Sequence, residues 1–181
     1  LARAYWLRLA AIHEVLGQID QAAGCHAKVL EIDPADAQAL DAMEGLFSGT
    51  ERYQDLIGVI RRRIELADDV HDREALYSKM ASVYEDQLGQ PEQAIAAYVE
   101  VLSLDDTSLV ALRALDGLYS RQKKFSELGE NLEAQLRLAE NEEEEIRLML
   151  RLAALQESEL NLVPNSIETY RQVLDRVPTD I

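Results

Sequence analysis

The sequence repeats itself at one fixed spacing, and this repeat limits what the chain can fold into more than any other feature. The spacing, here called the repeat interval, separates Ala22 from Ala94 and again Ala94 from Ser166. Two different blocks of apolar residues recur at it: Ala22, Val29 and Leu30, then Ala94, Val101 and Leu102, then Ser166, Val173 and Leu174; and Ala39, Leu40, Leu46 and Leu56, then Ala111, Leu112, Leu118 and Leu128. Because the two blocks alternate, the structural unit is half of the repeat interval, which is typical of a stacked array of small units.

Within each unit the apolar residues recur at helical spacing. Leu76, Met80 and Val83 lie along one face of a helix, and no strand-like alternation competes with this pattern. The sequence therefore predicts an all-α chain built from five helical hairpins. The ten predicted helices span residues 2–16, 20–32, 35–48, 53–68, 72–88, 91–104, 108–122, 125–140, 142–160 and 164–176.

The residues that begin and end helices follow the same interval. Gly17, Gly89 and Asn161 are each one repeat interval apart, each follows a leucine, and each tolerates a left-handed backbone, so we expect all three to end helices. Asp20 and Asn141 are expected to cap helix N-termini. The prolines agree with these boundaries: Pro34 and Pro178 lie where helices should end, and Pro91 and Pro164 lie in first turns.

The composition narrows the class of partner and of compartment. In 181 residues there are 34 Asp and Glu against 18 Lys and Arg, a formal net charge of −16, which disfavours nucleic acid because phosphates need a basic surface. No apolar run approaches the roughly 18 residues of a membrane-spanning helix, so we expect no membrane partner. The chain begins at Leu1 without a methionine, and we expect it to be a fragment of a longer, cytoplasmic protein.

Three of the hairpins carry a recognisable residue pattern. It reads Trp6, Leu9, Ala10, His13, Ala22, His26, Val29 and Pro34, then Tyr77, Met80, Ala81, Tyr84, Ala94, Tyr98 and Val101, then Met149, Leu152, Ala153, Gln156, Ser166, Tyr170 and Val173. This pattern resembles the tetratricopeptide repeat, in which large, small and aromatic residues recur at fixed positions of two helices. The resemblance implies a right-handed α-α superhelix, a solenoid of about ten antiparallel helices.

The other two hairpins depart from the family pattern. Glu44 and Asp116 stand where a small residue is expected in the first helix, and Leu56 and Leu128 replace the small residue of the second. Well-matched and degenerate repeats therefore alternate along the chain, and we expect the degenerate hairpins to be slightly splayed. We expect one solenoid domain over residues 1–181, with hairpins at about 2–34, 35–70, 71–106, 107–141 and 142–178.

Nothing in the sequence indicates an enzyme, and we expect no catalytic, cofactor or metal site. Cys25 and His26 are adjacent on one helix and point about 100° apart, which does not suit a nucleophile and its base. A zinc site that combined them with His13 would lack an evident fourth ligand. No glycine-rich phosphate-binding loop is present.

Two runs of like charge are interpreted as surface features. Glu142–Glu145 follow Asn141 at a predicted helix start, where the helix dipole favours negative charge. Arg61, Arg62 and Arg63 are expected to form a solvated helix face balanced by nearby acids, Glu65 and Asp55.

Tetratricopeptide repeat arrays bind proteins and peptides on the concave surface formed by the first helix of each hairpin, and the resemblance implies the same role here. The groove residues that we expect to contact a peptide or protein partner are Asp41, Ser78, Glu85, Arg113 and Arg121. Two alternatives remain open. The chain is a structural spacer or self-assembly module that associates through exposed solenoid ends, where Val173 and Leu174 are expected to form an apolar edge, or it is a regulatory or recruitment segment of a larger enzyme or receptor.

Overall fold

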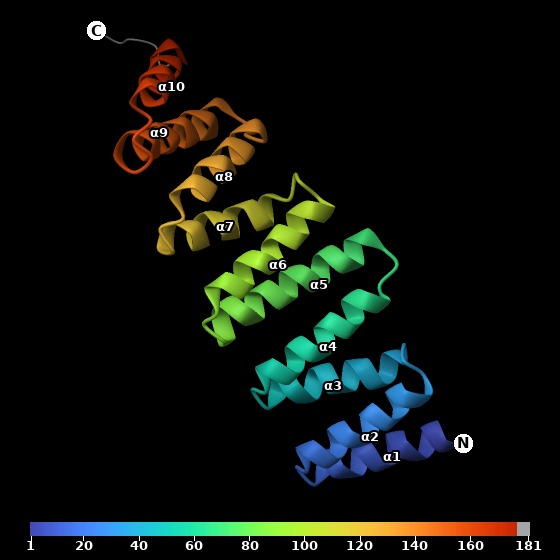
Figure 1. Ribbon diagram of the computed structural model, residues 1–181. Coiled ribbons are helices and arrows are strands. Elements are labelled where there is room, and N and C mark those ends of the chain that lie inside the picture. The colour runs from blue at the N-terminus through green and yellow to red at the C-terminus, as the bar shows by residue number, and fades with distance from the viewer. Residues whose placement is uncertain (177–181) are drawn as a thin grey trace. The chain divides into compact units, whose positions relative to one another are not determined.

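The computed structural model describes residues 1–176, and in that part of the chain ten α-helices and no strand are found (Figure 1). They are α1 Ala2–Val15, α2 Ile19–Ile32, α3 Ala37–Gly49, α4 Tyr53–Leu66, α5 Val70–Ser82 with the π-helical turn η1 Val83–Gln87, α6 Pro91–Leu104, α7 Leu109–Arg121, α8 Phe125–Arg137, α9 Glu142–Ser158 and α10 Val163–Arg176. The predicted all-α fold is confirmed. With η1 counted as the end of α5, every predicted helix end lies within one turn of the observed end.

The chain divides into two compact units. The first comprises Leu1–Gln90, and the second begins at Pro91. In the first unit the packing runs from α1 to α2, α3, α4 and α5 in order, and in the second it runs from α6 through to α10. Each helix thus packs mainly against its neighbours in sequence, which is the packing of a helical repeat solenoid.

Small residues set how closely the helices approach. Ala10, Ala22, Ala39 and Ala81 have no exposed surface in the first unit, and Ala94, Ala111 and Ala153 have none in the second. Larger apolar side chains fill the space between these contacts, with Ile60 and Leu118 completely buried. A continuous core therefore runs between successive helices of each unit.

The three predicted helix ends are confirmed by their backbone angles. Gly17, Gly89 and Asn161 have φ of 68°, 59° and 53°. In each case the next N–H donates to a carbonyl of the preceding helix, as when Leu162 N–H donates to the Gln156 carbonyl at 2.7 Å. The repeat interval of the sequence is therefore also the spacing at which these left-handed residues recur along the backbone.

Of the two predicted N-caps, one is confirmed and one is wrong. The Asn141 side chain accepts a hydrogen bond from the Glu144 N–H at 2.9 Å. Asp20 does not cap, because α2 already begins at Ile19 and the Asp20 carboxylate instead accepts from Arg52 Nη1 at 2.6 Å. Pro178, expected to follow the last helix, lies outside the described residues.

Two further left-handed residues were not predicted from the sequence. Glu51 and Lys123, which are also one repeat interval apart, have φ of 58° and 55°. The following N–H groups, of Arg52 and Lys124, donate to the carbonyls of Phe47 and Tyr119, both at 2.9 Å. Neither Glu nor Lys favours this backbone region, so no residue preference pointed to these turns.

Candidate functional site

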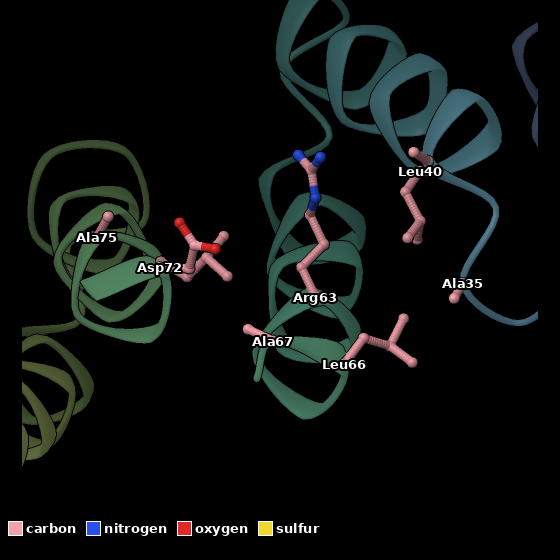
Figure 2. A pocket seen from close by; sticks show the side chains of 9 residues that line it. Ala35, Leu40, Arg63, Leu66, Ala67, Asp72 and Ala75 are labelled. Atoms are coloured by element: carbon pink, nitrogen blue, oxygen red, sulfur yellow. The ribbon is translucent and has the colours of Figure 1, made fainter. Parts of the chain in front are cut away.

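The first unit contains an open pocket of about 560 Å³ between α3, α4 and α5 (Figure 2). Its lining is Ala35, Ala37, Leu40, Arg63, Leu66, Ala67, Asp72, Ala75 and Leu76. All of these residues except Arg63 and Asp72 are alanine or leucine. A pocket of this size with a mostly apolar lining is within the range of protein ligand sites.

The alanines create the space, and the leucines make it apolar. Leu40 is buried, but Leu66 is 39% exposed although it lies near the end of a well-packed helix. In Figure 2, Arg63 on α4 and Asp72 on α5 lie on facing sides of the pocket, while Leu40 and Leu66 lie on the side of Ala35. The pocket therefore has an aliphatic part and a charged part.

Beside the pocket, four side chains form what we call the acid–base cluster: Asp41 and Glu44 on α3, Arg63 on α4 and Lys79 on α5. One terminal nitrogen of Arg63 donates to Glu44 and the other to Asp41, and Lys79 Nζ donates to the second oxygen of Glu44. Two carboxylates and two cations make the cluster neutral. Three consecutive helices are joined through it.

Glu44 is the centre of this cluster, with only 16% of its side chain exposed. Desolvation raises the pKa of its carboxyl, but the hydrogen bonds and positive charges of Lys79 and Arg63 outweigh that effect, so the pKa of Glu44 is lowered from its ordinary value of 4.5. Glu44, which stands where the family pattern has a small residue, thus accepts hydrogen bonds from both α4 and α5.

The cluster also fixes the electrostatics of the pocket. Because Arg63 is paired with two carboxylates, its positive charge is already compensated, and Arg63 is poorly suited to attract an anion into the pocket. Asp72 differs, since among the described residues no side chain donates to its carboxylate. The charged part of the pocket is therefore negative.

The predicted groove residues are divided between the two units. In the first, Asp41 is 64% exposed and joins the acid–base cluster, while Ser78 and Glu85 are half-buried on one face of α5 and η1. In the second, Arg113 lies 3.4 Å from Glu144 and is exposed, and Arg121 is the exposed last residue of α7.

The three consecutive arginines form the predicted solvated face only in part, because Arg61 is exposed but Arg62 and Arg63 are half-buried. Arg61 donates to the Tyr84 hydroxyl at 2.7 Å, and Arg62 donates to the Pro34 carbonyl at 3.2 Å. Arg63 belongs to the acid–base cluster, and Asp55, one of the two acids expected to balance the run, accepts from Arg52. The partners of the three arginines lie on other helices or loops, so proximity along the chain predicted the wrong partners.

The second unit contains a counterpart of the site one repeat interval later. Asp116, 13% exposed, replaces Glu44 and accepts two hydrogen bonds from Arg151, at 2.8 and 2.6 Å, and one from Gln135 at 3.1 Å. The pocket lining changes, however, because Leu109 and Arg147 stand in place of Ala37 and Ala75. A pocket of about 300 Å³ is found there, lined by Asn141, Glu143, Glu144 and Arg147.

Sequence reasoning missed the pocket because alanines at exposed positions of an amphipathic helix carry no signal by themselves. For the acid–base cluster beside the pocket, however, the sequence did contain a signal. The acids Glu44 and Asp116 are one repeat interval apart, and so are the bases Lys79 and Arg151. Paired charges that recur at the repeat interval indicate a structural contact rather than two independent departures from the family pattern.

The histidines considered as metal ligands have other partners. His13 Nδ1 is 2.6 Å from the Gln18 amide oxygen, and buried His26 places Nε2 2.7 Å from Glu14. Across residues 1–176, no group of three or more His, Cys, Asp and Glu side chains is arranged to hold a metal ion. None of the helices in those residues combines the length and apolar character needed to cross a membrane.

Comparison with known proteins identifies the repeat and the fold. Residues 75–108 match the tetratricopeptide repeat family model. Structures with the same fold include MamA (16% identity, TM-score 0.51, 97% of this chain and 91% of that chain) and a tetratricopeptide repeat protein from Parabacteroides merdae (16% identity, TM-score 0.53, 99% and 68%). A third is YrrB, described as a tetratricopeptide repeat protein with an unusual peptide-binding site (14% identity, TM-score 0.50, 97% and 86%). No curated protein matches the sequence.

Proposed function

We propose that this chain, a helical solenoid with the fold of tetratricopeptide repeat proteins and a tetratricopeptide repeat at residues 75–108, is a non-enzymatic scaffold that binds an extended peptide segment of a protein partner. The observation that carries the proposal is the open apolar pocket between α3, α4 and α5, beside the acid–base cluster. An extended peptide offers the side chains that such a surface can hold. A cytoplasmic location and a single solenoid domain belong to the same proposal.

The residues proposed to contact the partner are Asp41, Ser78 and Glu85 in the first unit and Arg113 and Arg121 in the second. Asp41 and Arg113 are exposed, yet each already has an ionic partner within the chain. Replacing either of them disturbs a contact of the folded state as well as a binding surface. Ser78 and Glu85 lie on one face of α5 and η1 in the first unit, so the two residues are tested together.

The test is selection of peptides from a displayed library of random octapeptides, followed by fluorescence anisotropy on a selected peptide. We expect the double variant Ser78→Arg/Glu85→Lys to weaken binding about tenfold or more, since it changes both size and charge on the proposed surface. The matched control is Glu100→Lys, an exposed acid on α6, which should leave affinity unchanged. A library that gives no specific binder contradicts the proposed function.

Self-association is a second candidate, favoured by exposed apolar residues on the first and last helices. Tyr5 and Ile12 on α1 are 64% and 56% exposed, Leu16 just after that helix is 62% exposed, and Leu174 on α10 is 65% exposed. Val173 does not contribute, because it is only 6% exposed, contrary to the apolar edge expected from the sequence. Light scattering over a wide concentration range tests this candidate, and a mass that stays at one chain contradicts it.

A further inference from the structure

The inference concerns which side chains of a partner the pocket accepts, and it rests on the proposed function. We propose that the pocket between α3, α4 and α5 binds an aliphatic side chain of the partner peptide, and that Asp72 pairs with a lysine or arginine next to it in that peptide.

The aliphatic preference follows from the lining. No aromatic ring lines the pocket, and apart from Arg63 and Asp72 its lining is alanine and leucine, so the side chains of its aliphatic part offer no hydrogen-bond partner to a tyrosine hydroxyl or a tryptophan N–H. Leu66 exposes 39% of its surface, and covering it with another alkyl group removes apolar surface from water. The side chains of leucine, isoleucine, valine and methionine satisfy these conditions.

The basic preference follows from the charges. The acid–base cluster is neutral within itself, and Arg63 uses both terminal nitrogens on carboxylates. Asp72 is therefore the group that decides the sign of charge the pocket meets in a partner. A lysine or arginine is attracted to that carboxylate, whereas an acidic residue is repelled by it.

The second unit carries the same combination of groups within its own chain. At the counterpart of the pocket, Leu109 replaces Ala37 and Arg147 replaces Ala75. Arg147 Nη2 lies 3.4 Å from Oε1 of Glu144, the residue that corresponds to Asp72 one repeat interval earlier. One unit thus contains an aliphatic side chain and a cation paired with the acid, and the other unit has alanines at both positions. The partner peptide therefore supplies to the first unit the aliphatic side chain and the cation that Leu109 and Arg147 supply within the second unit.

The experiment uses the full chain and the displayed octapeptide library. Selected peptides are expected to share an aliphatic residue beside lysine or arginine. Anisotropy with such a peptide should show at least a tenfold loss of affinity for Ala37→Leu/Ala75→Arg, which copies the second unit into the pocket. The matched control is Ala96→Arg, an exposed alanine on α6, which should bind as the unchanged chain does.

A charge exchange separates a local effect on binding from a folding defect. Asp72 is exposed, so Asp72→Lys should fold normally, lose affinity for the selected peptide, and gain affinity for the same peptide with glutamate in place of its basic residue. Restored binding in that pair supports the assignment. Failure of the exchange, or selected peptides without the aliphatic–basic pair, overturns it.

The outcomes also distinguish this inference from the proposed function. If peptides are selected whose binding is weakened by Ser78→Arg/Glu85→Lys but not by Ala37→Leu/Ala75→Arg, the scaffold function stands and the pocket preference is wrong. If the library gives no specific binder, both are wrong.

Discussion

The site formed by α3, α4 and α5 and its counterpart formed by α7, α8 and α9 share one framework but differ in what the framework surrounds. Both place a mostly buried acid on the first helix, Glu44 in one and Asp116 in the other, and both bind it from the next two helices. The first site has Ala37 and Ala75 where the second has Leu109 and Arg147. In the part of the chain that the structure describes, the first site alone has an apolar pocket of about 560 Å³. The comparison indicates that the acid belongs to the architecture of the repeat, while the pocket lining differs between the two units.

The shared acid has a physical role that the family pattern hides. In a well-matched repeat a small residue at that position lets two helices approach closely. In the degenerate repeats the acid accepts hydrogen bonds from both following helices, through Arg63 and Lys79 in one case and through Gln135 and Arg151 in the other. Direct bonds between helices thus replace close approach, and the departure from the pattern is compensated rather than tolerated.

The largest expected effect comes from removing these acids. Glu44→Ala leaves Arg63 and Lys79 beside a partly buried gap, and Asp116→Ala does the same to Arg151 and Gln135, so each should destabilise the fold by about 2–3 kcal/mol. Urea unfolding followed by circular dichroism measures the change. Asp41→Ala, which removes an exposed member of the same cluster, is the control and should cost less than about 1 kcal/mol.

Similar losses for Glu44→Ala and Asp116→Ala would support a common architectural role for the two acids. A large loss in one unit with no loss in the other would break the comparison. It would mean that the two networks look alike but that only one of them stabilises its unit.

A smaller effect is expected from pH, because protonation removes the charge of the acid but keeps its side chain in place. For Asp116, as for Glu44, desolvation raises the pKa but is outweighed, here by Arg151 and Gln135, so both pKa values are lowered from their ordinary values of 3.8 and 4.5. The stabilisation is therefore fully present above those ordinary values and is lost as the pH falls through the lowered ones. Urea midpoints measured from about pH 6 down to about pH 3 should fall, and Glu44→Ala should flatten part of that fall.

The residues show why the fold was predictable and the site was only partly so. Helix number, helix ends and the left-handed turns at Gly17, Gly89 and Asn161 follow from local spacing and residue preference. The acid–base cluster instead depends on which helices Arg63 faces, since its partner Glu44 lies on the preceding helix. The pocket exists because alanines stand where the second unit has larger side chains, and this difference is recognised only when the two units are compared. Local rules determine the helices, whereas the site arises from contacts between them.

The smallest expected effect concerns a left-handed turn that both units share, at Glu51 and at Lys123, where neither residue type favours that backbone conformation. Glu51 and Lys123 hold φ of 58° and 55°, a region that costs an ordinary residue more than glycine. Glu51→Gly and Lys123→Gly should therefore each stabilise the chain by about 0.5–1 kcal/mol in urea unfolding. Gly17→Ala is the reciprocal control: a Cβ there meets no atom within 4 Å, so any loss of stability comes from the backbone alone. Equal gains at positions 51 and 123 would show that the left-handed turn costs the same free energy in both units. The two units would then differ only in the pocket lining and in the chemistry of the mostly buried acid. A gain at one position only would show that the backbone framework differs as well.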